Sequence, residues 1–126
     1  MSDINLELQE KIKQIAVKII KYYRGRGPEY VKVKIENSDI ITIDIKGILS
    51  NVTEILVNEG AVNIVTEYWK IMKPHLEKNF LHEVATILKR DFVYSWKVCN
   101  IENDNRTVVI TIKLIDYGLI EKKDII

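Results

Sequence analysis

Arg24-Gly25-Arg26-Gly27, followed by Pro28, is the segment of this chain best suited to chemistry. Backbone amides of successive glycines beside guanidinium groups can hold an anion such as a carboxylate or a phosphate. The segment differs from a phosphate-binding P-loop, because no Lys-Ser or Lys-Thr pair follows it and because it leads from a helical pattern into a strand pattern. These residue types predict an anion-binding or interaction site at the segment.

The same segment also has a purely structural interpretation. Glycine ends helices, proline prevents a helix from continuing, and arginine near a helix C-terminus complements the helix dipole. These local rules account for the glycines and for Pro28, and they favour the structural interpretation. They give no reason for two arginines, so Arg24 and Arg26 are the side chains on which a site hypothesis rests.

The other reactive side chains form no recognisable site. His75 and His82 are seven residues apart, whereas helical metal pairs are usually four apart. The single Cys99 lies in a strand pattern without an activating base. The sequence contains no nucleophile motif and no paired-carboxylate motif. We therefore expect no metal or other cofactor, and a protein that is not an enzyme.

Composition limits the class of protein. The 126 residues fit one domain, with the 47% hydrophobic and 29% charged residues of an ordinary globular chain. A net charge of +1 argues against nucleic acid as a partner. One cysteine suits a reducing compartment, no apolar run is long enough for a membrane span, and no secretory signal is visible. We expect a cytoplasmic location.

Hydrophobic periodicity predicts the elements that flank the arginine segment. About residues 5–23 carry apolar side chains at spacings of three and four, which indicates an amphipathic helix. Residues 30–46 contain two alternating runs around a polar turn, which indicates an antiparallel hairpin. The arginine segment therefore connects the end of a helix to the start of a hairpin.

A helical region follows in the predicted order. Residues 52–90 indicate helices interrupted at Glu59-Gly60. Pro74 removes a backbone donor and crowds the preceding turn, so it predicts a kink or break near residues 71–73.

A second hairpin completes the pattern. It occupies residues 92–115 with a strong turn at residues 103–106, and a charged tail follows at residues 117–126. The order α-β-β-α-β-β predicts an α+β domain with a four-stranded, mainly antiparallel sheet and helices packed on one face. The order of the strands within the sheet stays open.

The strand that begins at Phe92 is apolar on both faces. Its second face carries Val93, Cys99 and Ile101, and an apolar face of this kind needs a cover. One alternative is a central strand that the same chain partly covers. The other is a sheet face that meets a partner subunit, which predicts a homodimer.

Aromatic residues on a small sheet are also typical of RNA-stacking surfaces. Tyr94 and Trp96 share one face of the predicted strand. The low net charge and a core position for these rings argue against RNA. With Lys32 and Lys34, the arginine segment leaves an RNA- or anion-binding module as the alternative function.

Several motifs resemble the MpsC-like (YbcI-like) bacterial family, whose first helix ends in a Tyr-Gly-Arg-Gly-Pro type signature. Here the corresponding stretch is Tyr23-Arg24-Gly25-Arg26-Gly27-Pro28. The family's Gly-x-Leu-Thr looks like residues 47–50, which are Gly-Ile-Leu-Ser. The similarity spans about residues 8–115 and includes Leu56, Glu59, Gly60 and the Lys73-Pro74 pair.

The chain departs from that family pattern in places. Thr53 stands where a glutamate is common, no arginine lies near Tyr68-Trp69, and Arg90-Asp91 replaces a Thr-Gly turn. The chain is therefore identified as a divergent member. The resemblance implies an accessory role at a sodium-translocating, membrane-potential-generating system linked to inorganic carbon uptake, with a protein partner at a membrane complex. It implies no catalytic residue.

Overall fold

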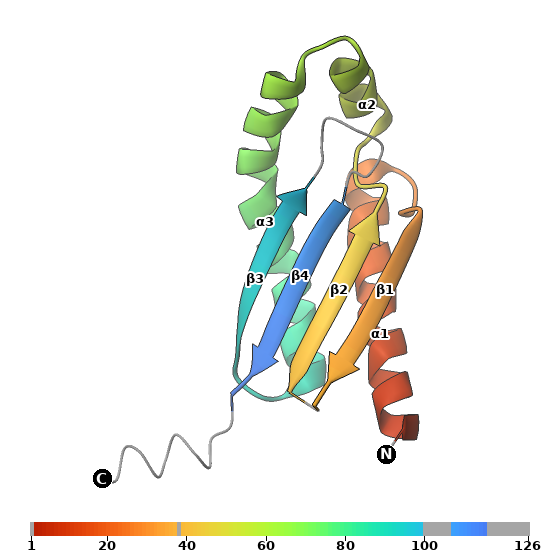
Figure 1. Cartoon of the computed structure of the whole chain (residues 1–126), viewed down its shortest axis with the longest axis vertical. Coiled ribbons are helices and arrows are strands. Elements are labelled where there is room, and N and C mark those ends of the chain that lie inside the picture. The colour runs from red at the N-terminus through yellow and green to blue at the C-terminus, as the bar shows by residue number, and fades with distance from the viewer. Residues whose placement is uncertain (1, 38, 100–106, 116–126) are drawn as a thin grey trace, which may run out of the picture.

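Three helices and a four-stranded sheet form the α+β fold of the computed structural model, which describes residues 2–37, 39–99 and 107–115 (Figure 1). The predicted fold class is confirmed. The strands are all antiparallel to their neighbours, and their order in the sheet is β1-β2-β4-β3. Along the chain the elements are α1 (Ser2–Arg24), β1 (Tyr30–Glu36), β2 (Ile40–Lys46), α2 (Asn51–Asn58), α3 (Val62–Leu88), β3 (Phe92–Cys99) and β4 (Thr107–Leu114).

Helix α1 ends at Arg24 because the next residue takes a left-handed conformation. Gly25 has φ of +89°, and its amide donates to the carbonyl of Lys21 at 2.8 Å. A residue with a Cβ would be strained at this φ, so glycine suits the position. The chain then turns through Gly27 and Pro28 into β1.

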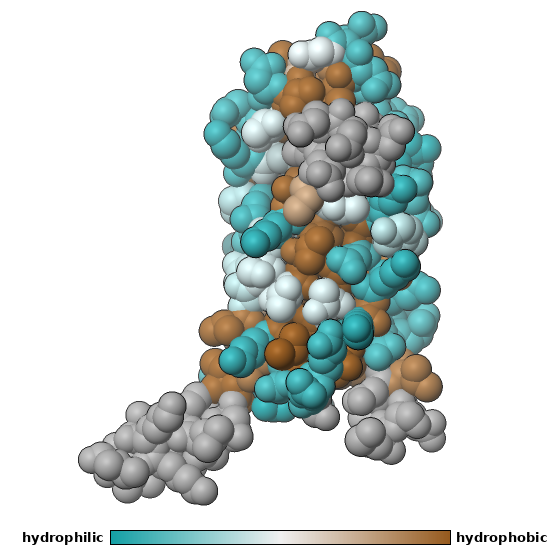
Figure 2. Space-filling view, in the orientation of Figure 1, coloured by the Kyte–Doolittle hydropathy of each residue, from teal (hydrophilic) through white to brown (hydrophobic). Residues whose placement is uncertain are grey.

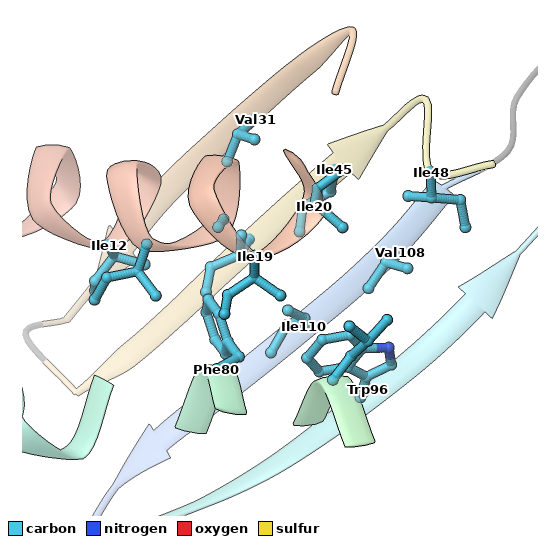
Figure 3. Packing of buried hydrophobic residues seen from close by; sticks show 14 of the residues in the cluster. Ile12, Ile19, Ile20, Val31, Ile45, Ile48, Phe80, Trp96, Val108 and Ile110 are labelled. Atoms are coloured by element: carbon cyan, nitrogen blue, oxygen red, sulfur yellow. The ribbon is translucent and has the colours of Figure 1, made fainter. Parts of the chain in front are cut away.

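Helices α1 and α3 lie together on one face of the sheet (Figure 1). Alternate residues of the two central strands are buried beneath them, and Ile43 of β2 stands opposite both Val33 and Ile110. Figure 3 shows side chains of α1, α3 and β3 meeting over these strands, among them Ile12, Ile19, Ile20, Phe80 and Trp96. The apolar alternation of the sequence thus faces a single core.

Helix α3 continues through Pro74, so no break occurs at residues 71–73. Leu76 and Phe80, which follow the proline, are buried in the same core as Trp69, which precedes it. Packing on both sides of Pro74 holds the helix together despite the missing backbone donor.

Strand β3 lies at an edge of the sheet, so the alternative of a central strand is wrong. Trp96 faces the helices and is buried, which argues against a role in stacking RNA bases. On the uncovered face Val93 is 57% exposed and Cys99 is half-buried. Ile101, the turn at 103–106 and the tail at 117–126 lie outside the described residues.

The uncovered face of the sheet is mixed in character (Figure 2). One cross-strand row contains Lys32, Asp44, Val109 and Lys97, and the next row contains mainly hydroxyl side chains. This face therefore lacks the continuous apolar surface of a large obligate interface.

Candidate functional site

The guanidinium of Arg24 is the centre of the arginine segment. Its side chain is only 6% exposed although it ends a surface helix. Nε donates to the carbonyl of Leu49 at 2.6 Å, and Nη1 donates to the carbonyl of Gly27 at 2.8 Å. Nη2 donates to Glu54 Oε1 at 3.2 Å. Each of its nitrogens thus has an acceptor within the chain.

Arg26 reaches the same carboxylate oxygen. Its Nη2 lies 3.0 Å from Glu54 Oε1, and its side chain is 54% exposed. One partly buried carboxylate therefore receives two guanidinium groups, which leaves the three side chains with an excess of one positive charge. Because Arg26 is half exposed, that excess charge is accessible to a partner.

These contacts join three parts of the chain, and we call Arg24, Arg26 and Glu54 the arginine clasp. Arg24 links the end of α1 to the segment between β2 and α2 through Leu49, and to α2 itself through Glu54. Charged groups hydrogen-bonded in this way contribute more than neutral pairs. The clasp therefore fixes α2 relative to α1 and the sheet.

Helix α2 is held in place by its own cap as well. The Ser50 hydroxyl oxygen accepts from the Thr53 amide at 3.3 Å, as an N-cap residue does. Thr53 in turn donates its hydroxyl to the Ser50 carbonyl at 2.9 Å and is buried. With α2 fixed, Glu54 points toward the arginines.

An aromatic cluster lies next to the clasp. The Tyr23 ring lies 6.1 Å from the Tyr68 ring and 5.2 Å from the Trp69 ring, measured between centroids. Burial raises the pKa of Tyr23 well above its usual range, and the neighbouring Tyr68 hydroxyl raises it further. Tyr23 is therefore neutral at physiological pH and acts as part of the packing.

The structure gives each predicted site residue a definite position. Arg24 is internal, whereas Arg26 is accessible. The Gly25 amide donates to Lys21, and the Gly27 carbonyl accepts from Arg24. Whether the segment binds an anion stays a prediction.

Sequence reasoning missed the acceptors of the clasp. Glu54 is 30 positions from Arg24 and looks like an ordinary exposed helical carboxylate in the sequence. Leu49 contributes a backbone carbonyl, which no side-chain pattern reveals. The only signal in the sequence comes from the family resemblance. A glutamate is common at the position that Thr53 occupies here, and Glu54 follows Thr53 directly.

Helix α2 carries two exposed apolar side chains, which lie close to Glu54 in the sequence. Val52 is 67% exposed and Ile55 is 60% exposed. In Figure 2 hydrophobic side chains are visible among hydrophilic ones at the end of the molecule where α2 lies. Helix α2 therefore carries exposed apolar side chains and also receives the accessible positive charge of Arg26 at Glu54.

The two histidines, His75 and His82, lie on α3. His75 Nε2 lies 3.4 Å from the Asn79 amide nitrogen, and His82 lines a groove of about 540 Å³ between α1 and α3. Among the residues the structure describes, no three His, Cys, Asp or Glu side chains gather as metal ligands would. No helix in these described segments is long and apolar enough to cross a membrane.

The comparison with known proteins gives one match. The family model described as "Na+-translocating membrane potential-generating system (MpsC)" matches residues 5–114, which is most of the chain. No curated protein and no solved structure matches it significantly.

Proposed function

Because the chain belongs to the MpsC family, we propose that it is a non-enzymatic accessory domain that docks on a protein of a sodium-translocating, membrane-potential-generating system. In this proposal the domain works on the cytoplasmic side, and α2 provides the docking surface. The observation that carries the proposal is the exposure of Val52 and Ile55 on α2, the helix whose Glu54 holds the accessible Arg26.

The α2 surface has the properties of a small docking site. Burying each of these aliphatic side chains against a partner contributes about 1–2 kcal/mol. The arginine clasp and the Ser50 cap already hold α2 in position, so little conformational freedom is lost on binding. The excess positive charge at Arg26 favours a partner with an acidic group next to an apolar surface.

The non-enzymatic part of the proposal rests on how the clasp is used. Arg24 is the most buried charged side chain of the site, and its donors are committed to acceptors of the same chain. A guanidinium in this state stabilises a fold, whereas a catalytic guanidinium needs donors that face a substrate. This arrangement supports a scaffold role.

The test is complementation in cells that lack the gene. The double variant Val52→Asp/Ile55→Asp should fold but fail to restore the sodium-dependent membrane potential, because charged side chains oppose burial in an apolar interface. Ile64→Asp/Ile71→Asp places the same two charges on exposed positions of α3 and serves as the matched control. Full activity of the double variant would refute the α2 docking surface, and no effect of deleting the gene would refute the accessory role.

A second candidate function is anion binding at the arginine turn, and the excess charge of the clasp favours it. Phosphate should then raise the thermal midpoint of the wild-type chain more than that of Arg26→Ala. Equal shifts at constant ionic strength would contradict this candidate. Arg26→Ala is preferred to Arg24→Ala because it removes accessible charge and keeps the hydrogen bonds from Arg24 to the carbonyls of Leu49 and Gly27.

A further inference from the structure

Both tryptophans of the chain lie against one cleft between α3 and β3. The cleft has a volume of about 220 Å³. Trp69 and Trp96 form part of its wall, together with Thr66, Lys70, Lys73 and Val98. None of these residues belongs to the arginine clasp or to the exposed surface of α2.

The indole nitrogens of these tryptophans are donors without acceptors. Trp69 is 3% exposed and Trp96 is 5% exposed, and neither Nε1 has a hydrogen-bond partner in the described structure. A buried donor without a partner is unfavourable, and native proteins contain few of them. Two such donors beside one cleft indicate that the cleft receives an acceptor.

Aromatic contacts hold both indole rings in place. The Trp69 ring meets the Tyr23 ring edge to face at 5.2 Å, and the Trp96 ring meets the Phe80 ring in the same manner at 5.8 Å. Figure 3 shows the Trp96 nitrogen on the side of its ring away from Phe80. These contacts favour one orientation of each ring, which preorganises their donors.

The remaining lining residues suit a negatively charged acceptor. Lys70 and Lys73 line the cleft, and the glutamates paired with their ammonium groups, Glu67 at 2.9 Å and Glu77 at 3.2 Å, do not line it. The Thr66 hydroxyl donates to the Val62 carbonyl. Val98 and the faces of the indoles supply apolar surface. We propose that this cleft binds a small organic carboxylate, with its oxygens toward the indole donors and its short chain against Val98.

Binding requires the atoms that cover the indole nitrogens to move aside. Both indole nitrogens are covered in the free protein. Lys70 and Lys73 line the cleft, and each is paired with a glutamate of its own helix. The Lys70–Glu67 pair is exposed on both sides and therefore weak, so Lys70 can move aside and then face the ligand. The ligand thus gains hydrogen bonds that the free protein lacks.

Intrinsic fluorescence tests the proposal directly, because both fluorophores line the site. Formate, acetate and propionate are titrated into the intact chain at constant ionic strength. The proposal requires a saturable change in fluorescence and tighter binding of propionate than of formate, since a longer chain buries more apolar surface. Acetamide, which has the shape of acetate without its charge, should bind at least about tenfold more weakly. A linear, non-saturating response or equal binding of acetamide would overturn the proposal.

Substitutions locate the binding within the molecule. Trp69→Phe and Trp96→Phe each remove one donor, keep an aromatic ring and leave one fluorophore, and each should weaken acetate binding about tenfold. Lys73→Gln leaves the core untouched and should weaken binding several-fold, whereas Lys13→Gln makes the same charge change on α1, away from the cleft lining. Equal affinities of these two lysine variants, with both folded by circular dichroism, would place the ligand elsewhere.

Discussion

Replacing Arg24 by alanine tests whether the arginine clasp holds the fold together. The substitution removes the donors to the Leu49 carbonyl, the Gly27 carbonyl and Glu54. Leu49 is buried, so its carbonyl loses a partner that water cannot easily replace. Glu54 keeps its contact with Arg26, which limits the loss on that side.

The magnitude follows from these contacts. Hydrogen bonds to charged groups contribute about 1.5–3 kcal/mol each, and neighbouring bonds are not additive. With one buried carbonyl left unsatisfied and one carboxylate still paired, we expect Arg24→Ala to lower the free energy of unfolding by about 3 kcal/mol. In a domain of this size that change lowers the Tm by about 10 °C. Arg24→Lys keeps the charge but not the planar fork, so it should lose about 2 kcal/mol.

Urea unfolding followed by circular dichroism gives the required free energies. Arg26→Ala is the control, because it removes an identical side chain that is mainly exposed and should lose less than about 1 kcal/mol. If Arg24→Ala and Arg26→Ala destabilised the protein equally and by less than about 1 kcal/mol, the internal role assigned to Arg24 would be refuted.

Three further predictions concern the backbone, the pH dependence and the assembly. Gly47 has φ of +82°, and a Cβ there would lie 2.8 Å from the backbone nitrogen of Glu29. Gly47→Ala should therefore lower the free energy of unfolding by about 2–3 kcal/mol. Gly25→Ala should lower it by only about 1 kcal/mol, because no atom lies near the added Cβ there. Thermal melts of the two variants should show the larger decrease in Tm for Gly47→Ala. The raised pKa of Tyr23 means that the unfolded chain loses this proton at a lower pH than the folded chain. The free energy of unfolding should thus be unaffected by the ionisation of Tyr23 below about pH 10 and should fall above it. Between pH 9 and 11 the free energy of unfolding should fall less steeply in Tyr23→Phe than in the wild-type chain. Equal slopes in the two proteins would contradict the raised pKa of Tyr23. We also expect the homodimer in solution, through the face that exposes Val93, and light scattering that finds a monomer at high concentration would exclude it.

Local sequence patterns were sufficient to predict the elements themselves. The spacing of apolar residues in α1 and their alternation in β1 and β2 depend only on which side of an element faces the core. The left-handed Gly25 ends α1 where the glycines predicted an end. The α+β class follows from the order of these elements, because two hairpins and their helices can bury their apolar sides in few ways.

Pro74 shows where a local rule is insufficient. The proline predicts a kink or a break, yet α3 passes through it without a break. The deciding factor is the burial of Trp69 before the proline and of Leu76 and Phe80 after it, which a local propensity does not include.

The sequence by itself determined the elements, the family motif and the identity of the arginines as residues that need an explanation. Only the tertiary structure placed β3 at the edge of the sheet, because β2 and β4 pair across more than 60 residues and alternate too similarly for the pattern to select a partner. Only the tertiary structure likewise brings Arg24 into contact with Glu54 and places Trp69 and Trp96 at one cleft. Periodicity reports which side of an element is buried, whereas these sites depend on which distant elements are packed against each other.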